Sequence, residues 1–220
     1  MATATIAAGP ETLAELVERL GDIPLERIQL KPAPGTATEQ DLIAALEAPQ
    51  KHLCELADGV LVEKPVGTKE ALLASILGHY LWTFVERRDL GLVVGPDGPF
   101  RLWLGLVRIP DVSLILWNRL PRGELPDEAI AGVVPDLAVE VLSRRNTPKE
   151  MRRKLREYFE ADVRLVWFIY PRTQTAEVYR SPTDMRRIGK SQSLDGGDVL
   201  PGFKLPLQKL FARARRRRAK

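Results

Sequence analysis

Apolar residues recur three and four positions apart in two stretches of the chain, which is the spacing of one face of a helix. The first stretch, residues 69–88, predicts a long helix. The second predicts a helix over residues 148–161, where Thr147 can cap the first turn and Glu150 can close a capping box. Two shorter helices, each with a threonine that can cap it, are expected over residues 11–20 and 38–46.

Short runs rich in β-branched and aromatic residues lie between these helices and predict strands. The first two runs are joined at Asp58-Gly59, a strong hairpin signal. The run over residues 135–143 is apolar on both faces around Glu140, as in a strand covered on both sides. Further strands are expected over residues 92–95, 100–104, 107–117, 164–170 and 175–180. The order of helices and strands implies one α/β domain with a mixed sheet.

Composition limits the size of the fold and the kind of metal site. With 220 residues, of which 45% are hydrophobic, the chain can bury one sizeable core, and two full domains would be crowded. The single cysteine, Cys54, excludes an internal disulfide and fits a reducing cytoplasm. Two histidines and one cysteine are too few for the usual zinc sites. A metal would therefore be held by carboxylates, which favours Mg²⁺ or Mn²⁺.

The positive charge of the chain is concentrated at its C-terminal end. Removing the six positive charges between Arg213 and Lys220 turns the net charge of +4 into −2 for the rest. Such a tail could hold phosphates without reading sequence, or it could be a solvated terminus. We expect an N-terminal helical extension over residues 1–48, one domain over residues 49–211 and a basic tail over residues 212–220. No run of about 18 apolar residues or signal peptide is evident, so no membrane association and a cytoplasmic location are expected.

Two predicted strands carry a carboxylate where packing favours an apolar side chain. Glu140 has apolar neighbours on both faces of its strand, and Asp111 shares a strand face with Ile109 and Ile115. A buried ionised carboxylate is costly unless it is paired or binds a cation. Taken alone, each acid is explained by an arginine or a backbone amide as its partner. As a pair on neighbouring strands, the two acids could share one hard divalent cation.

The spacing of these acids resembles a known signature. Pro110-Asp111, followed after 28 intervening residues by Glu140, resembles the motif of PD-(D/E)XK nucleases. More narrowly, the block over residues 135–171 resembles the Uma-type family of putative restriction endonucleases of bacteria, and the resemblance covers roughly residues 50–211. It implies a restriction-endonuclease-like fold, in which a central mixed β-sheet is flanked by helices. It also implies divalent-metal-dependent cleavage of phosphodiester bonds.

The chain departs from that motif at the catalytic lysine. The superfamily has a lysine two residues after the glutamate, where this chain has Leu142. The resemblance implies that the role moves to the following helix, where Lys154 matches. Helical spacing places Lys154 with Met151 and Tyr158, facing the preceding strand. Lys154 would orient the attacking water or neutralise charge at the phosphate. The alternative is a lysine that extends to solvent from the helix boundary.

A third acid could complete a metal site with Asp111 and Glu140. Related proteins often carry a metal-facing residue where this chain has Glu70, in the first turn of the long helix. The alternative for Glu70 is that it complements the helix dipole. Glu63 and Glu55 flank the hairpin turn and rank second and third, since both could be surface cross-strand residues.

Other polar and aromatic residues are expected to have structural roles. Asp136 lies too far along its strand from Glu140 to share a metal, at roughly 13 Å. His79 and Trp82 are expected to be packing residues on the long helix. Glu157 is expected to point away from the side of its helix that carries the lysine.

These observations predict a metal-dependent endonuclease that acts on DNA, with Asp111, Glu140 and Lys154 as catalytic residues and Mg²⁺ or Mn²⁺ as cofactor. Many nucleases of this superfamily are dimers, so a homodimer is expected by analogy. One alternative is a catalytically inactive nucleic-acid-binding protein on the same fold, which Leu142 keeps open. Another is an interaction or regulatory protein without nucleic-acid contact.

Overall fold

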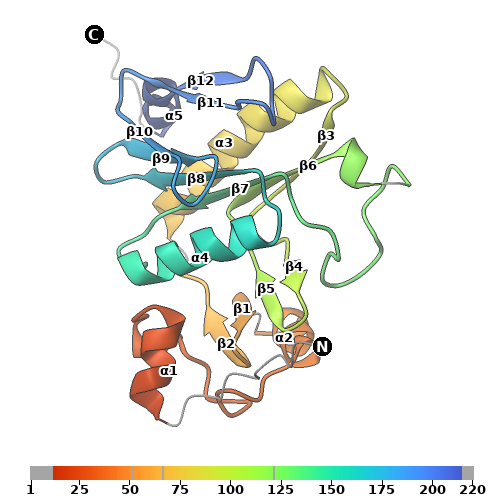
Figure 1. Ribbon diagram of the computed structural model, residues 1–220, viewed down its shortest axis with the longest axis vertical. Helices are drawn as coiled ribbons and strands as arrows, with labels where there is room; N and C mark the ends of the chain where they lie inside the picture. The colour runs from red at the N-terminus through yellow and green to blue at the C-terminus, as the bar shows by residue number, and fades with distance from the viewer. Residues whose placement is uncertain (1–11, 51, 66, 121, 215–220) are drawn as a thin grey trace, which may run out of the picture.

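The computed structural model describes residues 12–50, 52–65, 67–120 and 122–214. A six-stranded sheet in the order β10-β9-β8-β7-β6-β3 forms its centre (Figure 1). β7 and β8 run parallel, and the other neighbouring pairs are antiparallel. The strands are β3 (Gly91–Val94), β6 (Val112–Leu116), β7 (Leu137–Val141), β8 (Leu165–Tyr170), β9 (Thr175–Tyr179) and β10 (Met185–Ile188).

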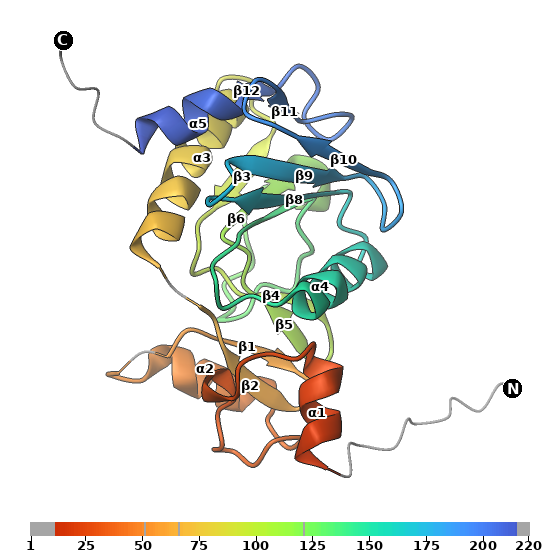
Figure 2. The same ribbon diagram turned by 90° about the vertical axis from the view of Figure 1, so that its left-hand side faces the viewer.

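Helix α3 covers one face of this sheet. Leu77 of α3 is fully buried in the same hydrophobic cluster as Val139 of β7 and Trp167 of β8. This layer also includes β11, β12 and α5, which follow one another toward the C-terminal end (Figure 2). Their bounds are α3 (Thr68–Glu86), β11 (Ser193–Asp195), β12 (Lys204–Pro206) and α5 (Leu207–Arg213).

Helix α4 (Pro148–Glu160) covers the opposite face. Its apolar side packs through Leu155 and Tyr158 onto Phe168 of β8. The predicted capping box is present: the Thr147 hydroxyl accepts a hydrogen bond from the Glu150 N–H at 3.0 Å, and the Glu150 carboxylate accepts one from the Thr147 N–H. Because both faces of β7 and β8 are covered by helices, these strands are apolar throughout except at Glu140.

A second, antiparallel sheet in the order β2-β1-β5-β4 lies beyond α4, next to α1 and α2 (Figures 1 and 2). The predicted hairpin joins β1 to β2, and Asp58 and Gly59 both have positive φ, at 51° and 68°, as a two-residue type I′ turn requires. The elements are α1 (Leu13–Leu20), α2 (Glu39–Glu47), β1 (Cys54–Ala57), β2 (Val60–Glu63), β4 (Phe100–Trp103) and β5 (Leu106–Arg108).

One buried arginine ties the N-terminal segment to the rest of the fold. Arg27 ends the short 3-10 helix η1 (Leu25–Arg27) and is fully buried. Its guanidinium pairs with Glu150 of α4 at 2.7 Å and donates to the main-chain oxygen of Glu63 at 2.8 Å. Both α1 and α2 begin with the predicted threonine caps, Thr12 and Thr38.

The strand predicted over residues 107–117 is divided in the structure. β5 ends at Arg108 and β6 (Val112–Leu116) begins in the other sheet, because Pro110 has no N–H to continue a ladder. Asp111 therefore lies at the junction between the two sheets. A 3-10 helix, η2 (Trp117–Arg119), follows β6. The sequence did not predict α5, which extends to Arg213 into the segment assigned to the basic tail; residues 215–220 of that tail lie outside the described residues.

The architecture is the expected single α/β domain with a central mixed sheet flanked by helices, and this prediction is confirmed. In the part of the chain that the structure describes, no helix has the length and apolar character needed to cross a membrane.

Candidate active site

Glu140 lies in β7 on the face that α4 covers. Its side chain is buried, and its Oε1 accepts a hydrogen bond from the Tyr158 hydroxyl at 2.7 Å and one from Lys154 Nζ at 3.1 Å. Both donors come from α4, one helical turn apart, so the same helix face that packs onto the sheet supplies them. No hydrogen bond between described residues engages Glu140 Oε2, which leaves that oxygen for another partner.

Lys154 is buried between two carboxylates. Its side chain is 1% exposed, and Nζ lies 2.8 Å from Glu55 Oε1 and 3.1 Å from Glu140 Oε1. Burial favours the neutral amine, but the charges of Glu140 and Glu55 outweigh it and hold the pKa of Lys154 above its ordinary value. Lys154 is thus a fixed cation at neutral pH, and it does not extend to solvent.

Asp111 faces Glu140 across the antiparallel pair of β6 and β7, since the register that pairs Val112 with Val139 places them opposite one another. Asp111 Oδ2 accepts the Val141 N–H at 2.6 Å, and its Oδ1 lies 2.7 Å from Lys64 Nζ. The carboxylate retains 16% exposure. Asp111, Glu140 and Lys154 are therefore brought together, with Lys64 as a cation that the sequence did not indicate.

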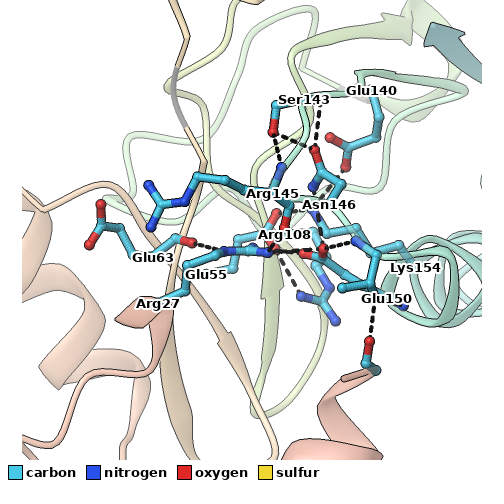
Figure 3. A network of polar contacts seen from close by, with 12 residues as sticks. Arg27, Glu55, Glu63, Arg108, Glu140, Ser143, Arg145, Asn146, Glu150 and Lys154 are labelled. Atoms are coloured by element: carbon cyan, nitrogen blue, oxygen red, sulfur yellow. Dashed lines mark hydrogen bonds and ion pairs between the residues drawn. The ribbon is translucent and has the colours of Figure 1, made fainter. Parts of the chain in front are cut away.

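Glu55, the lowest ranked of the third acids, lies nearest to this group (Figure 3). It is 1% exposed on β1, where Oε1 accepts the Ile109 N–H at 3.1 Å and Oε2 pairs with Arg108 at 2.9 Å. Arg108 also pairs with Glu157 at 2.6 Å, so the expectation that Glu157 points away is wrong. The signal that could have indicated Glu55 is the one that indicated Glu140: a charge among apolar residues on both faces of a strand.

Glu70 and Glu63 lie apart from the group in this structure. No hydrogen bond or ion pair among the described residues joins either of them to Asp111 or Glu140. The Glu70 carboxylate folds back against Gly67 at the start of its own helix, the placement expected of an acid that complements the helix dipole. Asp136 is fully buried and accepts the Leu116 N–H at 2.9 Å, in agreement with its expected structural role.

The two buried glutamates have opposite electrostatic environments. Burial raises the pKa of Glu140, the charge of Asp111 raises it further, and the positive charges of Lys154 and Lys64 do not fully compensate. Burial acts in the same direction on Glu55, but the charges of Lys154 and Arg108 outweigh it and lower its pKa to about 2. Glu55 is therefore fully compensated by neighbouring cations, whereas Glu140 is short of positive charge.

The carboxylates of Asp111 and Glu140 suit a hard divalent cation, but by themselves they form only part of its coordination shell. Among the described residues, no group of three or more histidine, cysteine or acidic side chains is positioned to hold a metal ion. Asp111 and Glu140 supply two carboxylates, one of them with an open oxygen and a raised pKa. Mg²⁺ commonly binds through one or two carboxylates and keeps several waters, so two acids and substrate oxygens suffice. Lys64 would have to move from Asp111 Oδ1 for this to occur.

A groove of about 380 Å³ leads to Asp111 between α3 and β3. His79 and Trp82 of α3 line it, and the Trp82 side chain is 45% exposed. The prediction that these two residues are packing residues is wrong, because both side chains are exposed at the wall of this groove and do not enter the buried cluster between α3 and the central sheet. The groove provides access from solvent to the acid that the sheets hold at their junction.

Comparison with known proteins agrees with the fold. The chain matches the model of the family described as Uma2, putative restriction endonuclease, over residues 40–208. Among solved structures it is similar to a putative nuclease of the DUF820 group from Anabaena variabilis, with a TM-score of 0.68 and 20% sequence identity, covering 80% of this chain and 98% of that one. This likeness shows a shared fold. No curated protein matches the chain.

Proposed function

Since the chain belongs to the Uma2 family of putative restriction endonucleases, we propose that it is a divalent-metal-dependent endonuclease that hydrolyses phosphodiester bonds in DNA. The observation that carries this proposal is the buried Lys154, held by Glu55 beside the open carboxylate of Glu140 and close to Asp111. In this proposal Lys154 on α4 takes the role of the superfamily lysine, whose position in this chain is occupied by Leu142.

Each residue has a distinct task in the proposed site. Asp111 and Glu140 would hold Mg²⁺ or Mn²⁺, which when bound supplies positive charge at the scissile phosphate. Tyr158 and Lys154 fix Glu140 through Oε1, and no other described residue engages its Oε2. Lys154 keeps its proton and stabilises negative charge that develops on the phosphate. Glu55 keeps that lysine charged and oriented.

A homodimer and a cytoplasmic location also belong to the proposal. A dimer would present two active sites to the two strands of a duplex. The lone Cys54 is a buried free thiol, which is consistent with a reducing compartment. Sedimentation of the purified chain, with and without a short duplex, distinguishes a dimer from a monomer.

The test is cleavage of supercoiled plasmid and short duplexes in Mg²⁺ or Mn²⁺. We expect nicking or cutting that requires the cation and falls by roughly 10²–10³-fold in Asp111→Ala and Lys154→Met. Arg156→Ala is the matched control, because Arg156 is exposed on the same helix as Lys154. Glu70→Gln measures whether that acid joins the site when substrate is bound. Circular dichroism shows whether each variant is folded.

Metal-dependent cleavage that survives in Asp111→Ala would contradict the assignment of the site. The second candidate is a DNA-binding protein without catalysis, and two observations favour it: Leu142 in the usual lysine position, and Lys64 on the Asp111 oxygen that a cation would need. Salt-sensitive DNA binding with no cleavage of any substrate would support that candidate.

A further inference from the structure

A larger groove, of about 800 Å³, lies on the α4 side of the central sheet. Its walls are the loop after β7, the first turns of α4 and the turn between β8 and β9. It begins at Leu142, which follows Glu140 by two residues, or roughly 7 Å at the rise of a strand. Asp111, Glu140 and Lys154 do not line this groove.

Aromatic side chains form a rigid floor in the groove. Glu177 Oε2 accepts hydrogen bonds from the Tyr170 hydroxyl at 2.7 Å and from the Tyr179 hydroxyl at 2.8 Å. Burial and these bonds to Glu177 raise the pKa of both tyrosines, so both hydroxyls stay protonated and keep donating. Phe168 packs edge-on to Tyr179, with ring centroids 5.3 Å apart. The rings are thus fixed before any ligand arrives.

Three exposed arginines surround this floor. Arg144, Arg152 and Arg172 line the groove from three different segments. None of them takes part in an ion pair or hydrogen bond with another described residue. Guanidinium groups without acidic partners around an apolar, aromatic floor complement a ligand that is flat and apolar at one end and anionic at the other.

We propose that this groove binds one unpaired nucleotide of the DNA substrate, with the base against the aromatic floor and the phosphates on the arginines. Bases of an intact duplex are stacked and cannot reach such a floor, whereas an unpaired or flipped base can. A base that stacks on an aromatic side chain strengthens binding by roughly 5- to 150-fold. The inference rests on the proposed function and adds a substrate class: DNA with an unpaired base close to the cut.

The test is equilibrium binding to two duplexes that differ only in one unpaired 2-aminopurine, whose fluorescence reports stacking. Asp111→Ala serves as the background, so that no strand is cut. We expect at least tenfold tighter binding to the duplex with the unpaired base, together with a change in its fluorescence. Arg152→Ala and Tyr170→Ala should each reduce the preference to less than threefold. Arg156→Ala, one turn along the same exposed side of α4, should retain it.

The outcomes separate this inference from the proposed function. Equal affinity for the two duplexes, or equal effects of Arg152→Ala and Arg156→Ala, would overturn the nucleotide groove even if the wild type cleaves DNA. A preference that depends on Arg152 and Tyr170 would support the groove even if no cleavage is found. If Tyr170→Ala does not fold, Tyr170→Leu removes the hydroxyl and the ring and leaves a smaller cavity than alanine does.

Discussion

Glu55 and Glu140 share one lysine, yet their surroundings shift their pKa values in opposite directions. The difference lies in the other charges and hydrogen-bond donors around each acid. Glu55 has Arg108 and Lys154, whereas Glu140 shares Lys154 and faces the charge of Asp111. Glu55, whose charge is fully paired, is suited to positioning Lys154. Glu140, whose charge is not fully compensated, is suited to binding a cation.

This contrast predicts the pH dependence of stability. The pKa of Glu55 is lowered from 4.5 to about 2, so its stabilising effect is complete above pH 4.5 and is lost as the pH falls toward 2. We expect Glu55→Gln to lower the free energy of unfolding at pH 7 by about 3 kcal/mol, because Lys154 and Arg108 lose a buried partner. Its stability should then change less than that of the wild type between pH 4.5 and 2. Urea denaturation across that range measures both.

Glu63→Gln is the matched control, because Glu63 lies on the adjacent strand and is only partly buried. It should keep the pH dependence of the wild type. Glu140→Gln should change the pH dependence of stability in the opposite direction. The folded chain raises the pKa of Glu140, so ionisation of this acid above pH 4.5 destabilises the wild type, and the variant lacks that effect. If the free energy of unfolding changes equally with pH in the wild type and in Glu55→Gln, Glu55 is not the acid that titrates in this range.

At the residue scale, the sequence could indicate only charges that interrupt an apolar pattern. Glu140 and Lys154 interrupt long patterns, in β7 and on α4, so they were identified. Glu55 interrupts an apolar run in the same way, but its strand has only four residues and gives a weaker signal, and Lys64 lies beyond the end of an equally short strand. Their partners lie far along the chain, on β5 and α4 for Glu55 and after β5 for Lys64, and no local pattern identifies them.

At the scale of elements, helix caps and the hairpin turn were predicted because a few adjacent residues determine them. Thr12, Thr38 and Thr147 all cap the helices expected from their spacing. The contact between η1 and α4 was not predicted, because Arg27 and Glu150 are separated by 123 positions. This pair determines where the N-terminal segment lies, and it also joins the capping box of the helix that carries Lys154.

We therefore expect Arg27→Met to release the N-terminal segment and to destabilise the domain by roughly 3–5 kcal/mol, because Glu150 would be buried without its charge partner. Hydrogen exchange should become faster in α1 and in the first turn of α4 and change little in β7 and β8. Arg156→Met is the control and should leave exchange unchanged. Uniform acceleration across the domain would show that the pair supports the whole core and does not anchor one segment.

At the scale of the whole molecule, the order of helices and strands was sufficient to predict one α/β domain with a mixed sheet. It could not predict the second sheet, because that sheet forms only when the strand expected over residues 107–117 is divided at Pro110 and its halves enter different sheets. The division has a functional consequence. It holds Asp111 between the sheets, where Glu140 approaches from β7 and Lys64 from the end of β2.

A site at such a junction should couple cation binding to the stability of the whole domain. A cation that binds only the folded chain stabilises it by about 2.7 kcal/mol at a concentration 100 times its Kd. We expect millimolar Mn²⁺ to raise the thermal midpoint of the wild type and to have little effect on Asp111→Asn or Glu140→Gln. Glu128→Gln, an exposed acid outside the group, should respond as the wild type does. Equal responses in all four proteins would mean that Mn²⁺ binds elsewhere and that Lys64 keeps its place on Asp111.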